Sequence, residues 1–121
     1  MYTIMFVLDD PSQLDAVLTA WRTVGVTGIT IVESSGFHRR QAHLLGARYI
    51  PLLPELQERV EQESYTLFAA VPTLPLVEQC FAATEQVVGD LREPNTGIIV
   101  AWPVALARGL DKREQQPEVE Q

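Results

Sequence analysis

The sequence is poor in cysteine and in lysine. Its only cysteine, Cys80, has no partner for an internal disulfide and offers a single ligand to a zinc ion. Its only lysine is Lys112, whereas arginine occurs eight times, so a bound phosphate or carboxylate would be held by guanidinium groups. The single cysteine argues against a disulfide scaffold and a cysteine-ligated zinc domain, and it fits a reducing compartment, the cytoplasm.

Long apolar runs and excess positive charge are also missing. The apolar runs are short and are interrupted by charged residues or proline, so we expect no membrane insertion. No basic residue precedes the apolar stretch near the N-terminus, and we therefore expect no export signal. The net charge of -7 makes binding to nucleic acid or to an anionic membrane unfavourable.

Familiar catalytic and phosphate-binding motifs do not occur either. Neither GxxxxGK[ST] nor GxGxxG is found in the sequence. Cys80 lies in an apolar pattern of helical spacing, which favours a buried structural thiol over a nucleophile. Because no acid and base stand in a recognisable catalytic setting, we predict that the protein is not an enzyme.

The amino-acid composition is typical of one folded domain. The chain has 121 residues, of which 46% are hydrophobic and 21% are charged. We predict that the domain spans residues 1–110. The remaining residues, 111–121, are almost all polar or charged and are expected to form a flexible C-terminal tail.

The hydrophobic pattern predicts an α+β fold. Strands are expected at 2–8, 28–33, 65–71 and 98–102, a first helix from an N-cap at Ser12 to Gly25, and a second helix from about Leu76 to Gly89. This βαββαβ order is that of the ferredoxin-like fold, in which two helices cover one face of a four-stranded antiparallel sheet.

Both faces of that sheet are predicted to be apolar. In the first strand Ile4 and Phe6 point to one side and Met5 and Val7 to the other, and the third and fourth strands repeat this pattern. A sheet face in contact with water normally carries polar side chains. We therefore expect the second face to be covered by another copy of the chain, unless the long connection or the tail folds across it.

The long connection between the second and third strands begins with a basic segment. Residues 37–50 contain three arginines and two histidines and no acid. Such a segment could attract a phosphate, a carboxylate or an acidic partner. Alternatively, its arginines could pair with Glu55, Glu58 or Glu61, which follow in the same connection.

The residues from Gly25 to Arg40, GVTGITIVESSGFHRR, resemble the signature of the P-II nitrogen-regulatory proteins. In that family a Gly-x-x-Gly-hydrophobic-Thr strand leads through Gly-Phe-Gly-Arg-Gln into a long T-loop. The predicted order of elements agrees with the family over residues 1–110, with the T-loop at about 37–63. The resemblance implies a ferredoxin-like homotrimer whose open sheet faces meet at its centre.

The resemblance also implies ligand-binding positions in clefts between subunits. The positions that match are Gly36, Phe37, His38, Arg39 and Arg40 at the T-loop base, Gly89 and Arg92 in a B-loop over 89–97, and Arg108 in a C-loop. Asp90-Leu91 replaces a Thr-Gly pair of the family, Leu110 replaces a second arginine, and Arg40 replaces a glutamine. An acid at Asp90 would repel a triphosphate, so weakened affinity for ATP is expected.

The resemblance implies a noncatalytic cytoplasmic regulator. It would need no cofactor, would bind a small effector such as ATP, ADP or AMP or another small anion, and would dock on a target transporter or enzyme through the T-loop. One alternative is a metal-binding trimer like the CutA proteins, which share the fold, with His38 and His43 as the available ligands. Another is a trimeric scaffold without a ligand.

Overall fold

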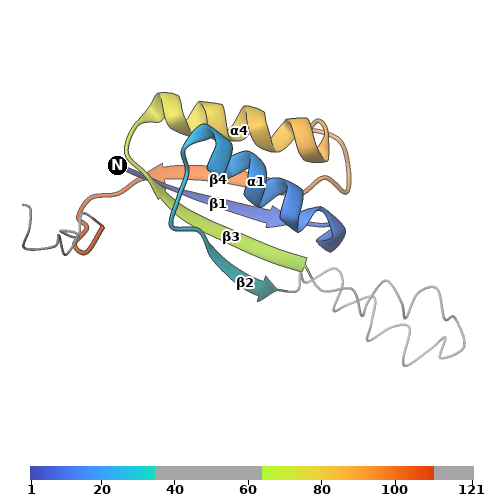
Figure 1. Ribbon diagram of the computed structural model, residues 1–121, viewed down its shortest axis with the longest axis horizontal. Coiled ribbons are helices and arrows are strands. Elements are labelled where there is room, and N and C mark those ends of the chain that lie inside the picture. The colour runs from blue at the N-terminus through green and yellow to red at the C-terminus, as the bar shows by residue number, and fades with distance from the viewer. Residues whose placement is uncertain (35–63, 111–121) are drawn as a thin grey trace, which may run out of the picture.

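A computed structural model describes residues 1–34 and 64–110 of the chain. The predicted T-loop at 37–63 and the predicted tail at 111–121 lie outside these ranges. The elements are β1 (Tyr2–Leu8), η1 (Pro11–Gln13), α1 (Leu14–Val24), β2 (Thr30–Ser34), β3 (Ser64–Val71), α4 (Leu74–Val88) and β4 (Ile98–Pro103). Figure 1 shows this order, which confirms the predicted sequence of strands and helices.

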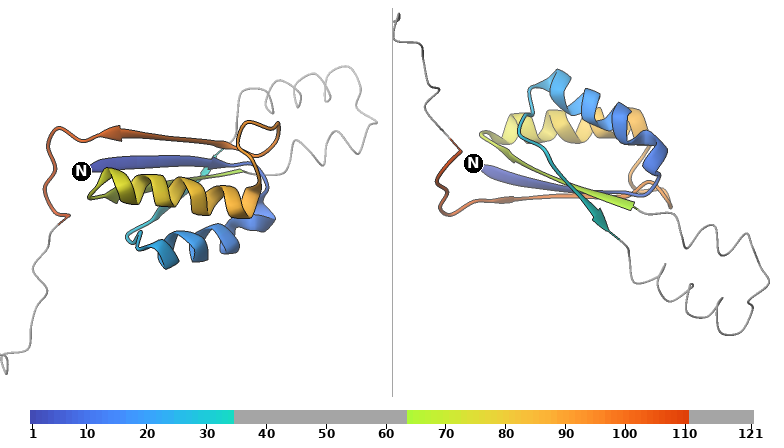
Figure 2. Two further views of the ribbon diagram at one scale, coloured as in Figure 1. Left: turned by 90° about the horizontal axis from the view of Figure 1, so that it is seen from above. Right: turned by 60° about the horizontal axis from the view of Figure 1, so that its bottom comes forward.

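The four strands form one antiparallel sheet in the order β2-β3-β1-β4. The two central strands, β1 and β3, are the most buried, as expected for strands that are paired on both sides. Both helices lie on the same side of the sheet, as the two views of Figure 2 show. The α+β ferredoxin-like fold predicted from the hydrophobic pattern is confirmed.

The start of the first helical segment differs from the prediction. Ser12 is not the N-cap of α1. Instead Asp10 caps the 3-10 turn before α1, because its Oδ1 accepts the Ser12 backbone N–H at 3.0 Å and the Ser12 hydroxyl at 2.7 Å. The predicted end is confirmed: Gly25 adopts φ 106° and its N–H bonds to the carbonyl of Arg22.

The second helix begins two residues before the predicted Leu76. Thr73 is its N-cap, with its hydroxyl oxygen accepting the N–H of Leu76 at 3.3 Å. Pro75 fits inside the first turn, where the missing N–H would have no partner within the helix. The helix ends at Gly89, as predicted, and the N–H of Gly89 bonds to the carbonyl of Glu85.

The core lies between the helices and the sheet. Trp21 of α1 packs against Phe6 of β1, with ring centroids 6.4 Å apart, and both side chains are fully buried. The Trp21 indole N–H donates to the Thr84 hydroxyl at 2.8 Å, and that hydroxyl donates to the carbonyl of Cys80 at 2.7 Å. This chain of hydrogen bonds joins α1 to α4 without leaving a buried polar atom of the three residues unpaired.

Cys80 is part of this core. Its thiol is buried, and desolvation raises its pKa to about 12, with a smaller opposing effect from the hydrogen bond to Thr84. A thiol with so high a pKa is a poor nucleophile at neutral pH. The structure thus confirms the prediction of a buried structural cysteine.

Candidate functional site

The face of the sheet opposite the helices carries apolar side chains that are accessible to solvent. Across the strands the register aligns Val100 with Met5, and Met5 with Phe68. The exposed fraction is 60% for Ile98, 42% for Trp102 and 44% for Val32. We call this surface the open face; its members are Val32 on β2, Met5 and Val7 on β1, Phe68 on β3, and Ile98, Val100 and Trp102 on β4. Its apolar character was predicted from the alternation along the strands.

Three hydroxyl groups meet where β2 ends and β3 begins. Ser34 Oγ lies 2.9 Å from Thr66 Oγ1 and 3.3 Å from Ser64 Oγ, and the Ser64 hydroxyl donates to the carbonyl of Ser34 at 2.9 Å. Ser34 and Ser64 are direct partners in the sheet. These contacts hold together the two strand ends between which residues 35–63 are inserted. The sequence analysis did not identify this cluster, because its members are about 30 residues apart.

The predicted B-loop, residues 89–97, connects α4 to β4. A turn is closed by the Glu93 N–H, which donates to the carbonyl of Asp90 at 2.9 Å, and the Thr96 hydroxyl donates to the carbonyl of Glu93 at 2.7 Å. Gly89 has φ 94° and Gly97 has φ 109°, so both use backbone conformations that favour glycine. A Cβ at Gly97 would lie 2.3 Å from the carbonyl oxygen of Val7, and this close approach fixes the end of the loop beside β1.

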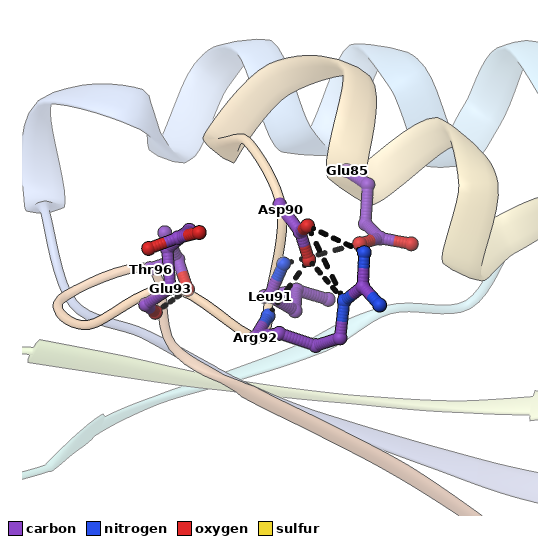
Figure 3. A network of polar contacts seen from close by, with 6 residues as sticks. All are labelled: Glu85, Asp90, Leu91, Arg92, Glu93 and Thr96. Carbon is purple, nitrogen blue, oxygen red and sulfur yellow. Dashed lines mark hydrogen bonds and ion pairs between the residues drawn. The ribbon is translucent and has the colours of Figure 1, made fainter.

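Within this loop Arg92 is paired with the preceding acid. Figure 3 shows the Arg92 side chain directed back toward Asp90. Arg92 Nη2 lies 2.9 Å from Asp90 Oδ2, Arg92 Nε lies 3.1 Å from Oδ1, and the Arg92 backbone N–H donates to the same Oδ1 at 2.9 Å. The sequence analysis predicted repulsion by Asp90 but not this direct pairing.

The pairing affects the charge state of both groups. Hydrogen bonds from the side chain and backbone of Arg92 lower the pKa of the Asp90 carboxyl, so it is ionised at neutral pH. The pKa of Arg92 is raised, chiefly by the hydrogen bond to Asp90. The Arg92 side chain is 90% exposed, and the pair is therefore open to competition from solvent ions.

A second carboxylate caps the same loop. Glu85, near the end of α4, accepts the backbone N–H of Leu91 through Oε2 at 3.1 Å (Figure 3). Two consecutive backbone N–H groups, those of Leu91 and Arg92, therefore point to carboxylates of the chain itself. Such adjacent N–H groups and a guanidinium are the donors that commonly hold phosphate in proteins.

Arg108, the residue predicted for the C-loop, lies at the opposite end of the sheet from Arg92. The segment that carries it is held at the start of β1 by the Val104 N–H, which donates to the carbonyl of Met1 at 3.0 Å. There Arg108 lines a shallow groove of about 450 Å³ together with Met1, Val104, Leu106 and Leu110. Since Gly97 lies against Val7 near the other end of β1, a single chain does not bring Arg92 and Arg108 together.

The end of the sheet at which residues 35–63 are inserted lies on the Arg92 side. Tyr65, next to Ser64, is paired with Leu8 at the end of β1, near the point where Gly97 approaches Val7. The predicted ligand-binding residues Gly36, Phe37, His38, Arg39 and Arg40 follow Ser34 but lie outside the described residues. The candidate metal ligands His38 and His43 also lie outside them.

Among residues 1–34 and 64–110, no group of three or more His, Cys, Asp and Glu side chains is placed to hold a metal ion. Neither helix in this part of the chain has the length and apolar character required to cross a bilayer.

Comparison with known proteins finds similarity in structure rather than in sequence. No protein-family model matches the sequence, and no curated protein is significantly similar to it. A solved structure of the B. subtilis GlnK-ATP complex is similar over 86% of this chain and 84% of that chain, with a TM-score of 0.56 and 14% sequence identity. GlnK is a P-II protein. At this identity the likeness shows that the chain has a P-II-like fold.

Proposed function

We propose that this protein is a noncatalytic signalling regulator of the P-II kind, active in the cytoplasm as a homotrimer. It would bind a small effector, an adenine nucleotide or another small anion, in clefts between subunits. It would dock on a target transporter or enzyme through residues 37–63. The observation that carries this proposal is the open face: an exposed apolar sheet surface in a chain with the fold of GlnK.

The burial of the open face provides the driving force for assembly in this proposal. Val100 and Trp102 on an edge strand, with Met5 and Phe68 beside them, present neighbouring apolar groups to water. Each apolar Å² removed from water contributes about 25 cal/mol, so association of identical faces is favourable. A closed ring of copies hides the face on every subunit, whereas a monomer leaves it exposed.

The positions of the arginines support a shared effector site. Arg92 lies on the loop at one end of β1, and Arg108 follows the strand end at the other. Both can contribute to one pocket only if they come from different subunits. In this proposal Arg108 of one subunit approaches the 89–97 loop of the next, together with the residues after Ser34.

Calorimetric titration of the purified protein with ATP, ADP, AMP, 2-oxoglutarate and bicarbonate tests the proposed function. We expect saturable binding of at least one of them, and we expect Arg108→Ala to weaken it at least tenfold. Gln79→Ala, on the exposed side of α4, is the matched control and should bind as the unchanged protein does. If none of the five compounds binds, the sensor function is wrong and a trimeric scaffold becomes the better description.

A further inference from the structure

The 89–97 loop contains hydrogen-bond donors of the kind that bind anions, and the chain's own carboxylates occupy them. Asp90 binds the guanidinium of Arg92 and the Arg92 backbone N–H, and Glu85 binds the Leu91 backbone N–H. An incoming phosphate would have to displace these carboxylates before it could use the same donors. The negatively charged carboxylates of Asp90 and Glu85 would also repel the phosphate at this short range.

We propose that Asp90 is a specificity-determining residue, which occupies Arg92 and thereby selects effectors of low negative charge over polyphosphates. The loop prefers a ligand with one phosphate or none, and it discriminates against a triphosphate. This inference rests on the proposed function only in placing the effector at this loop. The competition between the Asp90 carboxylate and an external anion follows from the observed contacts alone.

The loop's charge supports this selectivity. Its only described cation is Arg92, whereas Glu85, Asp90 and Glu93 each carry a negative charge around it. Pairing with Asp90 leaves no net positive charge to attract a polyphosphate. Without the Asp90 charge, Arg92 would be available as an exposed guanidinium, the group that holds phosphate most effectively in a two-point contact.

The direct test is a titration of the whole protein with sodium tripolyphosphate at constant ionic strength, followed by the NMR shifts of the Leu91 and Arg92 backbone amides. Asp90→Asn is the informative variant, because the asparagine carbonyl can still accept the Arg92 backbone N–H. We expect its half-saturation concentration to be roughly tenfold lower than that of the unchanged protein. Equal values for the two proteins would overturn the inference.

Two controls separate competition at Arg92 from a general effect of charge. Glu93→Gln removes the same charge from the same loop, but no side-chain contact joins Glu93 to Arg92 in the described structure, so a change below about twofold is expected. In a chain that also carries Arg92→Ala, Asp90→Asn should no longer improve binding. Equal gains from Asp90→Asn and Glu93→Gln, or a gain that persists without Arg92, would contradict the proposal.

A nucleotide titration then tests the selectivity itself. We expect the unchanged protein to bind AMP at least as tightly as ATP, and Asp90→Asn to shift this preference toward ATP by roughly tenfold. Tighter binding of ATP by the unchanged protein would contradict the inference. If no nucleotide binds to either protein, the proposed nucleotide effector is wrong, while the tripolyphosphate comparison still decides whether Asp90 blocks Arg92.

Discussion

The two faces of the sheet are built from alternating residues of the same strands, yet they have opposite surroundings. On β1, Ile4 and Phe6 are fully buried under the helices, whereas Met5 between them lies on the open face. On β4, Ile99 and Ala101 are partly buried against the core, and Val100 and Trp102 are exposed. Both faces are apolar, so hydrophobicity alone does not distinguish them. The distinction arises because both helices cross the same side of the sheet.

This difference predicts where a substitution affects folding and where it affects assembly. The covered face stabilises the single chain, and the open face is expected to stabilise contacts between copies.

The largest effect is expected on the covered face. Phe6→Ala removes a fully buried ring that contacts Trp21 and should lower the free energy of unfolding by about 3–5 kcal/mol. Urea denaturation at one fixed protein concentration measures this change. Met5→Ala, next to it on the open face, is the comparison; with both substitutions made in the monomeric Val100→Asp chain, it should cost less than half as much. Equal losses would mean that the two faces are equivalent in folding.

A charged residue introduced on the open face is expected to leave the fold intact and to prevent assembly of the copies. Val100→Asp places a carboxylate on the open face, on edge strand β4 beside its cross-strand partner Met5. We expect far-ultraviolet circular dichroism to be unchanged and the sedimenting species to become monomeric, because burying an unpaired charge between copies costs several kcal/mol. Gln79→Glu adds the same charge on the outer side of α4 and should leave the assembly intact. A Val100→Asp protein that stays oligomeric would exclude the open face as the interface.

At the periphery, β4 is held in place by a close backbone contact. Gly97→Ala would force a Cβ to within 2.3 Å of the Val7 carbonyl at φ 109°, and we expect a loss of about 2 kcal/mol of stability in thermal unfolding. Gly89→Ala also has a positive φ of 94°, but no atom lies within 4 Å of its Cβ position. It should cost about 1 kcal/mol, from the backbone conformation alone. The reverse order would show that steric contact at Gly97 does not position β4.

A further effect concerns the buried thiol and appears only at high pH. Cys80 has a pKa of about 12 in the folded chain, above its ordinary value of 9.0, because burial disfavours the thiolate. Its contribution to stability is complete below about pH 9 and is lost as the pH rises toward 12, by at most about 1.4 kcal/mol per pH unit. We expect Cys80→Ala to lose less stability than the unchanged protein between pH 8 and pH 10.5. An identical loss in both would contradict the raised pKa.

The strand and helix order could be predicted because each element has a clear hydrophobic period and a glycine or proline near its end. The predicted N-cap at Ser12 was wrong, because a 3-10 turn capped by Asp10 precedes α1 and the sequence pattern does not separate that turn from the helix. The predicted start of α4 at about Leu76 is two residues late, because Pro75 is tolerated inside the first turn.

The candidate site was less predictable than the fold. Arg92 was identified from the resemblance, but its pairing with Asp90 depends on a turn that brings residues two apart into contact. The hydroxyl cluster of Ser34, Ser64 and Thr66 depends on the register between β2 and β3, which the sequence does not specify. Periodicity therefore locates elements, whereas side-chain partners within a loop or across strands require the three-dimensional arrangement.

Sedimentation equilibrium of the unchanged protein at micromolar concentration tests the central claim, that further copies of the chain cover the open face. The chain has a mass of 13.5 kDa, so a homotrimer has a mass of about 40 kDa. We predict the larger mass, independent of concentration across the micromolar range. A single species of 13.5 kDa would show that the open face stays exposed in solution, and it would contradict both the assembly and the effector clefts that depend on it.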